Sequence, residues 1–362
     1  MKSKLLLISF FLVIVIYHKP VNAENRTGNV NAKKTKTEAS APPADSDRKI
    51  EAPPAEPESS KSDLSAERID PLSKYFLTGQ FVIGTPGFSL ELENQNQTKK
   101  VSYAPNLKGT VGIGISFKDL IGATASLHGS PSADSYTKGS TDYDDFHFVF
   151  DFKNFFIEAQ YQRYNGLYVS NSTEVDPTAA GNILAPNISM QNILLEFTYV
   201  FRPQKFSIQA AISRTERQIH SGGSWLIGAK ATQTTLENAT GLIPTQIRSY
   251  YGADQDLTKD RSRTLMLTGG YAYTISFSEK FFSTLLGVVG YGWGDSSFAS
   301  ATSTSSLTYG ASTVGLKFVL AYNGDSLIAG ISSENDSTLS LTNTVRINSN
   351  PTLSQLFVGT RY

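Results

Sequence analysis

The last ten residues, Leu353-Ser-Gln-Leu-Phe-Val-Gly-Thr-Arg-Tyr362, carry the strongest indication of the fold. They have the composition of a β-strand that ends on an aromatic residue. The closing strand of an outer-membrane β-barrel has this form, with alternate residues facing lipid and an aromatic residue in the periplasmic girdle. Leu356, Val358, Thr360 and Tyr362 would share the lipid face. Soluble strands also end on tyrosine, so this ending gains its weight from the rest of the chain.

The amino-terminal residues have the form of a secretory signal. Lys2 and Lys4 precede a largely apolar run over residues 5–16, and Val21-Asn22-Ala23 is a small-residue cleavage site. We therefore expect residues 1–23 to be a signal peptide. The apolar run is shorter than the roughly 20 residues that a membrane-spanning helix needs. The chain contains no cysteine, so disulfides and cysteine metal sites are excluded.

The composition of residues 24–75 differs from everything that follows. Prolines and charges of both signs are frequent, and Ala-Pro-Pro-Ala occurs twice, at 41–44 and 52–55. A segment with so little apolar surface cannot offset the entropy lost on folding. We expect a disordered periplasmic linker of polyproline-II character. It could contact peptidoglycan, or it could be a solvated leader without a specific partner.

From residue 76 onward, apolar and polar residues alternate. In Asp145-Phe-His-Phe-Val-Phe-Asp-Phe152 four phenylalanines occupy one strand face, while the aspartates and the histidine share the other face with a valine. The runs at 157–162, 192–201 and 205–213 repeat this pattern. Lipid outside and water inside a barrel would suit the two faces. The residues predicted to line the lumen are Asp145, His147, Asp151, Glu158, Gln160, Gln162, Asn192, Glu196, Lys205, Gln209 and Lys317.

Short connections alternate with long ones, as periplasmic turns and outer loops should. Tight turns are predicted at 118–119, 153–154, 202–204, 278–280 and 323–324, flanked by a girdle that includes Phe117, Phe206 and Tyr322. Long connections are predicted at 129–143, 166–187, 217–262 and 294–305. Strands are predicted at 77–93, 106–117, 120–128, 144–152, 155–165, 188–201, 205–216, 263–277, 281–293, 306–322, 325–340 and 352–362. The expected fold is all-β, a transmembrane antiparallel β-barrel of about 12 strands over residues 76–362, with 10 or 14 strands left open.

Several motifs occur in an order that resembles a known family. They are Tyr103-Ala-Pro-Asn106, Gly112-Ile-Gly-Ile-Ser-Phe-Lys118, Asn165-Gly-Leu-Tyr168, Ala321-Tyr-Asn-Gly-Asp325 and Phe357-Val-Gly-Thr-Arg-Tyr362. Together they are similar to an uncharacterised outer-membrane barrel family, domain of unknown function 4421, over about residues 76–362. The resemblance implies a barrel in the outer membrane of a Gram-negative-type bacterium. It implies no catalytic residues.

Three classes of function remain open from the sequence. The polar lumen set favours a narrow channel or transport pore, although a barrel of this size can also be filled by its own side chains. The linker and the long Ser/Thr-rich loops favour a structural, adhesive or envelope-tethering barrel without conductance. If the lumen is closed, Trp225-Leu226-Ile227 in the loop 217–262 is the first candidate for a plug.

An outer-leaflet lipid hydrolase is the third class. Two candidates, His220-Ser221 with Ser224 and His128-Gly-Ser130, have spacings that are not diagnostic of nucleophilic catalysis. Asp145 and His147 are better placed, on one face of one strand, but their backbones are about 6.5 Å apart along it, which is too far for a direct hydrogen bond unless the side chains lean together. We therefore expect no enzymatic activity, and we expect no cofactor and no metal.

Three arginines are predicted to lie on the lipid-facing side of their strands: Arg163, Arg214 and Arg263. All three would lie near the outer interface of the membrane. Arginine can hold phosphate through paired N–H donors. Lipopolysaccharide is thus an expected contact, and interfacial snorkelling is the alternative. Other expected partners are outer-membrane lipid and the barrel-assembly machinery. The chain is neutral overall, and its net charge is −3 once Lys2, Lys4 and Lys19 are removed with the signal, so nucleic acid is not an expected partner.

Overall fold

The computed structural model describes residues 69–70, 72, 76–107, 109–117, 121–127, 135–300 and 303–362, with the backbone alone for 121–127. The predicted signal peptide lies outside the described residues. So does the predicted linker, apart from residues 69, 70 and 72.

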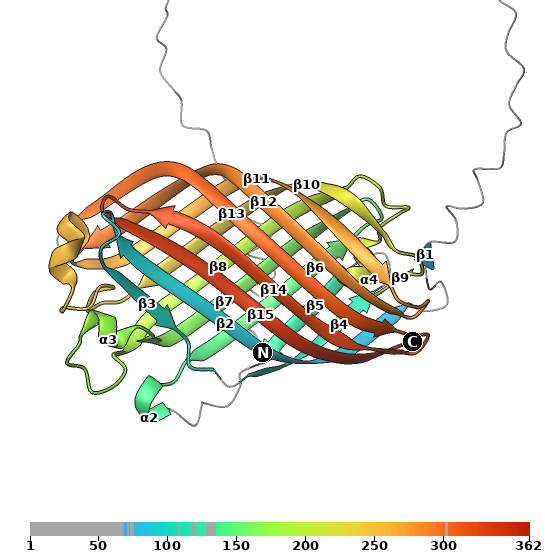
Figure 1. Cartoon of the computed structure of the whole chain (residues 1–362), viewed down its shortest axis with the longest axis horizontal. Coiled ribbons are helices and arrows are strands. Elements are labelled where there is room, and N and C mark those ends of the chain that lie inside the picture. Colours follow the sequence, from blue (N-terminus) through green and yellow to red (C-terminus); the bar gives the residue numbers. More distant parts are fainter. Residues whose placement is uncertain are drawn as a thin grey trace, which may run out of the picture. The chain divides into compact units, whose positions relative to one another are not determined.

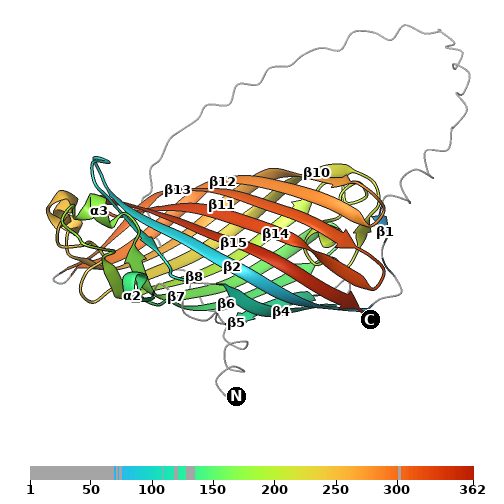
Figure 2. The same ribbon diagram turned by 60° about the horizontal axis from the view of Figure 1, so that its bottom comes forward.

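Twelve strands of the described chain form a closed antiparallel ring (Figure 1). The ring closes where the first and last of these strands pair over residues 78–94 and 345–361, as Figure 2 shows. In ring order the strands are β2 (Leu77–Asn94), β4 (Thr110–Phe117), β5 (Ile121–Leu127), β6 (Asp142–Asp151), β7 (Phe155–Val169), β8 (Leu184–Val200), β10 (Gly222–Glu237), β11 (Leu257–Ser276), β12 (Phe281–Ser300), β13 (Thr304–Asn323), β14 (Leu327–Leu341) and β15 (Val345–Arg361).

The two ends of this barrel differ. One end carries Tyr362 and the tight turns, and we name it the turn end; the opposite end is the loop end. The turn end also holds β1 (Ile69–Asp70), α4 (Ile208–Ala211) and β9 (Arg217–Gln218), as Figure 1 shows. The loop end holds β3 (Lys100–Ala104), α2 (Ser135–Lys138), α3 (Ser172–Val175) and the 3-10 helix η1 (Arg248–Asp254). No helix in the described residues is both long and apolar enough to span a membrane.

Alternation along the strands places apolar side chains on the outside of the barrel. Phe148 and Phe150 of β6 are exposed outward, while Asp145 and Asp151 are buried inward. The same parity continues around the ring, because each inward residue pairs with an inward residue of the next strand. The outward aromatics at the turn end include Phe117, Phe152, Phe277, Phe281 and Tyr322. This confirms the predicted two-faced barrel.

The largest error of the strand prediction lies between β8 and β10. The predicted long connection at 294–305 was also wrong, since β12 continues to Ser300 and β13 begins at Thr304. Residues 205–216 form no strand in the ring. Instead they contain α4, and Ser207 caps this helix by accepting a hydrogen bond from the backbone N–H of Ala210. Residues 222–237, placed in the longest loop by the sequence, form β10. Trp225 is 64 % exposed on the outer face of β10, so the Trp225-Leu226-Ile227 run belongs to the barrel wall and not to a plug.

A hydrophobic core closes the loop end. Leu242, Ile243, Ile247 and Tyr251, from the connection between β10 and β11, pack against inward residues of the wall such as Leu92. The core is fixed by hydrogen bonds: Tyr251 Oη donates to the carbonyl of Leu92 at 2.9 Å, and Tyr103 Oη donates to the carbonyl of Leu242 at 2.7 Å. Burial from water also raises the pKa of the Tyr251 phenol. The long outer connection therefore folds inward over the barrel mouth.

Candidate functional site

The turn end of the lumen is filled by residues 203–221, which we name the plug segment. Phe206 and Ile208 are completely or almost completely buried. They pack against inward apolar residues of the wall, among them Phe156, Leu226 and Leu286. Since these wall residues belong to β7, β10 and β12, the segment lies inside the ring. The predicted place of Phe206 in the outer aromatic girdle is therefore wrong.

The plug segment is held in a compact form by its own side chains. The amide of Gln218 donates to the carbonyls of Lys205 and His220, at 3.1 Å each, and its oxygen accepts from the backbone N–H of Ser207 at 3.0 Å. Gln218 is almost fully buried, so these bonds satisfy a polar group that would otherwise be costly to bury. The segment therefore has a defined fold of its own within the barrel.

Two buried arginines fasten the plug segment to the wall. Arg217 donates through Nε to the carbonyl of Asn323 at 2.8 Å, and Arg361 of β15 donates through Nη2 to the carbonyl of Arg214 at 2.6 Å. Nη2 of Arg361 also donates a hydrogen bond to the side-chain oxygen of Asn323. Charge-assisted hydrogen bonds of this kind are stronger than neutral ones. The plug segment is thus joined to the turn end of both β13 and β15.

Arg217 also joins the plug segment to Asp70, which lies near the end of the predicted linker. Its Nη1 lies 3.1 Å from Oδ2 of Asp70, and its Nη2 lies 2.7 Å from Oδ1 of Asp325. In addition, β1 pairs with β9, with Ile69 opposite Gln218 and Asp70 opposite Arg217. We name Asp70, Arg217 and Asp325 the latch. Ile69 and Asp70 thus contact the plug segment, although both lie within the predicted linker 24–75.

The latch carboxylate on the turn between β13 and β14 is electrostatically stabilised. Asp325 accepts hydrogen bonds from Lys280, at 2.8 Å, and from Arg217. These two cations lower the pKa of Asp325 to about 2. The same contact raises the pKa of Lys280. The Asp325 carboxylate is consequently ionised at neutral pH.

A layer of charged residues crosses the middle of the lumen. Glu158 of β7 is buried, and its two oxygens contact different partners: Oε1 lies 2.9 Å from Nε2 of His147, and Oε2 lies 2.6 Å from Nζ of Lys317. Lys317 of β13 also contacts Glu334 of β14 at 3.1 Å. β7 and β13 are not neighbours in the ring, so the pair formed by Glu158 and Lys317 spans the lumen.

A second ion pair crosses the lumen beside the first. Lys230 of β10 contacts Oδ2 of Asp336 on β14, although three strands separate β10 from β14 in the ring. Thr313 donates to the other carboxylate oxygen, Oδ1, at 3.0 Å. Lys230 is among the most buried side chains of the described chain. We name Glu158, Lys230, Lys317, Glu334 and Asp336 the cross-lumen charges.

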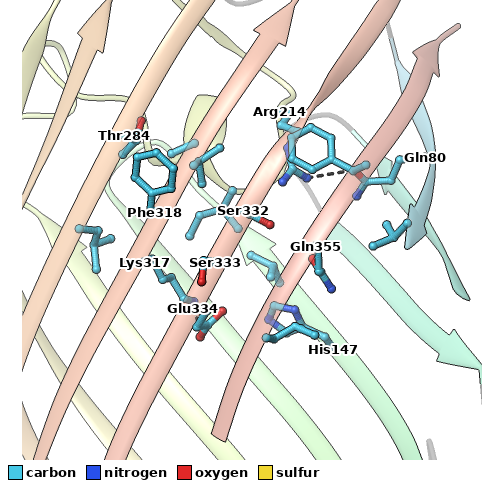
Figure 3. Close-up of a pocket in the computed structure, with 18 of the residues that line it drawn as sticks. Gln80, His147, Arg214, Thr284, Lys317, Phe318, Ser332, Ser333, Glu334 and Gln355 are labelled. Atoms are coloured by element: carbon cyan, nitrogen blue, oxygen red, sulfur yellow. Dashed lines mark hydrogen bonds and ion pairs between the residues drawn. The ribbon is translucent and has the colours of Figure 1, made fainter. Parts of the chain in front are cut away.

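Together, these layers leave little open space along the barrel axis. The loop end has an apolar core, the middle has the cross-lumen charges, and the turn end has the plug segment. A cavity with a volume of about 100 Å³ lies between the charged layer and the plug segment (Figure 3). Another, lined by Lys230 and Asp336 among others, has a volume of about 20 Å³. A lumen of this kind resembles a filled small barrel more than a water-filled pore.

Most of the predicted lumen residues do face the lumen. Asp145, His147, Asp151, Glu158, Gln160, Gln162, Asn192, Glu196 and Lys317 lie on inward positions of β6, β7, β8 and β13. Gln209 is buried in the lumen, but it lies on α4 of the plug segment and not on a strand. The prediction for Lys205 was wrong, since this residue is exposed at the turn end.

The three predicted lipid-facing arginines have different locations. Arg163 is exposed on the outer face and pairs with Asp144 at 2.6 Å. Arg263 is also exposed outward, and its Nε donates to Gln233 at 3.2 Å. The prediction for Arg214 was wrong, because the run 205–216 is not a strand. This residue lies in the plug segment and is 7 % exposed.

Sequence reasoning missed several residues of the site. Lys230 was placed in a loop, yet a single lysine among the small and apolar residues of 226–231 could have marked an inward strand position. Glu334 and Asp336 lie two residues apart, on one face of a strand that was predicted. Arg361 precedes the terminal aromatic, and nothing in its local pattern distinguishes it. In the described part of the chain, no group of His, Asp and Glu side chains is arranged to hold a metal ion.

Solved structures with a similar arrangement are outer-membrane barrels of low identity. The outer membrane protease OmpT from Escherichia coli matches with a TM-score of 0.38 and 7 % identity over 79 % of this chain and 97 % of that chain. The toluene transporter TodX of P. putida matches with 0.26 and 9 %, over 79 % and 90 %. Ail, the attachment invasion locus protein of Yersinia pestis, matches with 0.22 and 10 %, over 78 % and 99 %.

No curated protein sequence matches the chain. A family model does, over residues 69–362. This range begins at β1 and runs to the terminal Tyr362, so it contains the latch, the plug segment and the whole ring of strands. The chain belongs to the family described as Domain of unknown function (DUF4421).

Proposed function

We propose that this protein is an outer-membrane barrel with a closed lumen that anchors its amino-terminal arm, residues 24–68, to the membrane. The observation that carries the proposal is the latch. Arg217 of the plug segment binds both Asp70, directly after the arm, and Asp325 on the barrel turn. A solvated leader without a role would need no such connection. The arm would extend into the periplasm and meet peptidoglycan.

The filled lumen supports an anchoring role over a transport role. Two ion pairs cross the lumen, and the plug segment lies on the same axis. Buried ion pairs contribute little net stability relative to apolar packing, but they favour one arrangement of the groups that they join. A rigid and impermeable wall is useful for an anchor. The proposed role is non-enzymatic.

Retention of cell-wall material tests the anchoring proposal. The full chain and a variant that lacks residues 24–68 would be purified from envelopes and probed for bound peptidoglycan. The deletion keeps β1 and the latch, so heat-modifiable mobility on gels should be the same for both. We expect peptidoglycan with the full chain alone. Equal retention by both proteins would refute the anchoring role of the arm.

A gated channel is the second candidate, and the chemistry of the plug segment favours it. A permanent filling would be expected to be apolar, whereas this segment buries Gln209, Ser213, Arg214 and Thr215 against the wall. A polar side chain that leaves the wall can form hydrogen bonds with water instead. Moving it into water therefore costs less free energy than exposing an apolar side chain does. Replacing residues 204–219 by a short Gly/Ser loop and measuring liposome swelling in sugar solutions tests this candidate. Swelling by the variant alone would support a gate, and no swelling would refute it.

The exposed residues on the outer face of the barrel indicate which membrane components it contacts. We propose that Arg163 and Arg263 contact lipopolysaccharide phosphates, since both are exposed outward near the loop end. Outer-membrane lipid would cover the apolar belt, and the barrel-assembly machinery would insert the chain. Replacing both arginines by Gln should lower the amount of retained lipopolysaccharide. Unchanged retention would show that they only snorkel to the interface.

A further inference from the structure

The cavity between the plug segment and the charged layer is lined on one side by an arginine without a counter-ion. Arg214 is 7 % exposed, and within the described residues no carboxylate lies within ion-pair distance of its guanidinium, whose side-chain contacts are Gln80 and Phe357. Its contacts are neutral: Nη1 donates to Oε1 of Gln80 at 2.9 Å, and the guanidinium lies 3.5 Å from the ring centroid of Phe357. A buried cation without an anion is strongly disfavoured in proteins.

Part of the Arg214 guanidinium is left without an acceptor. Nε is buried and has no hydrogen-bond partner. Nη2 likewise has none among the residues that the structure describes. Nε and Nη2 form the side-on edge of a guanidinium, and this pair of parallel donors matches the two oxygens of a carboxylate or a phosphate. The edge that is suited to an oxyanion is therefore the edge that the protein leaves unused.

Other donors line the same cavity. Gln80 and Gln355 come from adjacent strands β2 and β15, and Ser332 comes from β14. In the described chain, the side chains of Gln355 and Ser332 form no hydrogen bond. Figure 3 shows Gln355 and Ser332 between Arg214 and the opposite side, where His147, Lys317 and Glu334 lie. Glu334 is the acid of this lining, and Lys317 already binds it.

The backbone holds Arg214 in an uncommon conformation. Its φ is 62°, which non-glycine residues rarely adopt. The conformation is fixed from both sides, because the N–H of Arg214 donates to the carbonyl of Gln209 at 2.6 Å and its carbonyl accepts from Arg361. Such residues occur often at ligand sites. The chain thus places this guanidinium at a defined point inside the barrel.

We propose that this cavity binds a small oxyanion of the size of phosphate or acetate, held side-on by Arg214 and by donors from Gln355 and Ser332. A volume of about 100 Å³ accommodates a small polyatomic anion. The anion neutralises the buried arginine and joins the plug segment to β14 and β15. Anion binding therefore stabilises the seated plug. This proposal is independent of the anchoring role.

Ligand-dependent heat stability and direct binding test the proposal. The full chain would be refolded in detergent with chloride alone, with inorganic phosphate, or with acetate, and bound anion would be measured after desalting by isotope counting. A ligand that binds only the folded state raises its melting temperature. We expect one phosphate or acetate per chain and a higher melting temperature than in chloride. Absence of both effects would show a water-filled cavity and overturn the proposal.

Three variants identify the residues responsible. Arg214→Gln should weaken binding at least tenfold and abolish the ligand-dependent rise in melting temperature. Arg261→Gln, which removes an exposed arginine on the outer face of β11, is the matched control and should bind as the native chain does. If Arg214→Gln fails to fold, Gln355→Leu removes a wall donor and leaves the plug segment intact, and it too should weaken binding. Native affinity in a folded Arg214→Gln variant, or in a folded Gln355→Leu variant, would overturn the proposal.

Discussion

Replacing Lys317 by Met should destabilise the barrel substantially. Lys317 Nζ lies 2.6 Å from Glu158 and 3.1 Å from Glu334. The side chain of Glu158 is only 3 % exposed, so the substitution removes the lysine ammonium from a buried carboxylate that keeps its contact with His147. Removing one member of a buried ion pair costs about 3–5 kcal/mol. Because Glu334 is partly exposed, we expect a loss near the lower limit, about 3 kcal/mol in the free energy of unfolding.

The assay for Lys317→Met is urea unfolding of the refolded barrel in lipid vesicles, followed by tryptophan fluorescence. With a denaturant slope of about 2 kcal/mol/M, the midpoint should fall by roughly 1.5 M urea. Lys259→Met is the matched control, since the pair of Lys259 with Glu237 is exposed and exposed pairs contribute at most about 1 kcal/mol. The double variant Lys317→Met, Glu158→Gln should recover part of the loss. A folded Lys317→Met variant with the native midpoint would refute a stabilising role for the cross-lumen charges.

Three further predictions concern the plug segment, the latch and the wall. Phe206→Ala should lower the free energy of unfolding by about 3–5 kcal/mol, because it leaves a cavity among buried apolar residues; a native urea midpoint would contradict the packing of Phe206 in the lumen. The pKa of Asp325 is lowered to about 2 from an ordinary value of 3.8, so its contribution should be complete above pH 4 and lost as the pH falls toward 2; a stability difference between native chain and Asp325→Asn that persists below pH 2 would contradict the ion pairs. In Trp293→Phe, fluorescence of Trp225 should be quenched by lipid with brominated acyl chains, and an unquenched signal would place Trp225 inside the barrel.

The sequence predicts the wall of the barrel well because alternation is a local property. Phe146, Phe148 and Phe150 alternate with Asp145, His147 and Asp151, and this period of two requires only that the segment be a strand with two different faces. The same reasoning assigned the inward positions on β7 and β8. The ring has the predicted number of strands, although one predicted strand is absent and another was missed.

Both errors have one physical cause. In residues 205–216, Phe206, Ile208 and Ala210 alternate as they would in a strand, but their apolar partners are inward wall residues such as Phe156 and Leu286. An alternating run can therefore be a lipid-facing strand or a segment packed inside the lumen, and the alternation alone does not distinguish them. Local signals were present nevertheless, since Pro203 limits strand pairing and Ser207 is a good helix cap.

The contacts across the lumen could not be predicted from local pattern. Glu158 and Lys317 are 159 residues apart, and they meet only because closure and strand register bring β7 and β13 to facing sides of the barrel. The same is true of Arg217, Asp70 and Asp325 in the latch. The alternation along β15 indicates that Arg361 points into the barrel. However, Arg361 donates to the carbonyl of Arg214 in the plug segment, and the fold of that segment was not predicted.

Single-channel recording shows whether the lumen of the native barrel is closed to ions. The purified full chain would be inserted into a planar lipid bilayer after its fold has been verified by heat-modifiable mobility on gels. We expect a silent bilayer for the native chain, because ions would have to cross the plug segment, the cross-lumen charges and the apolar core of the loop end. Discrete and sustained conductance steps from the native chain would contradict a closed lumen.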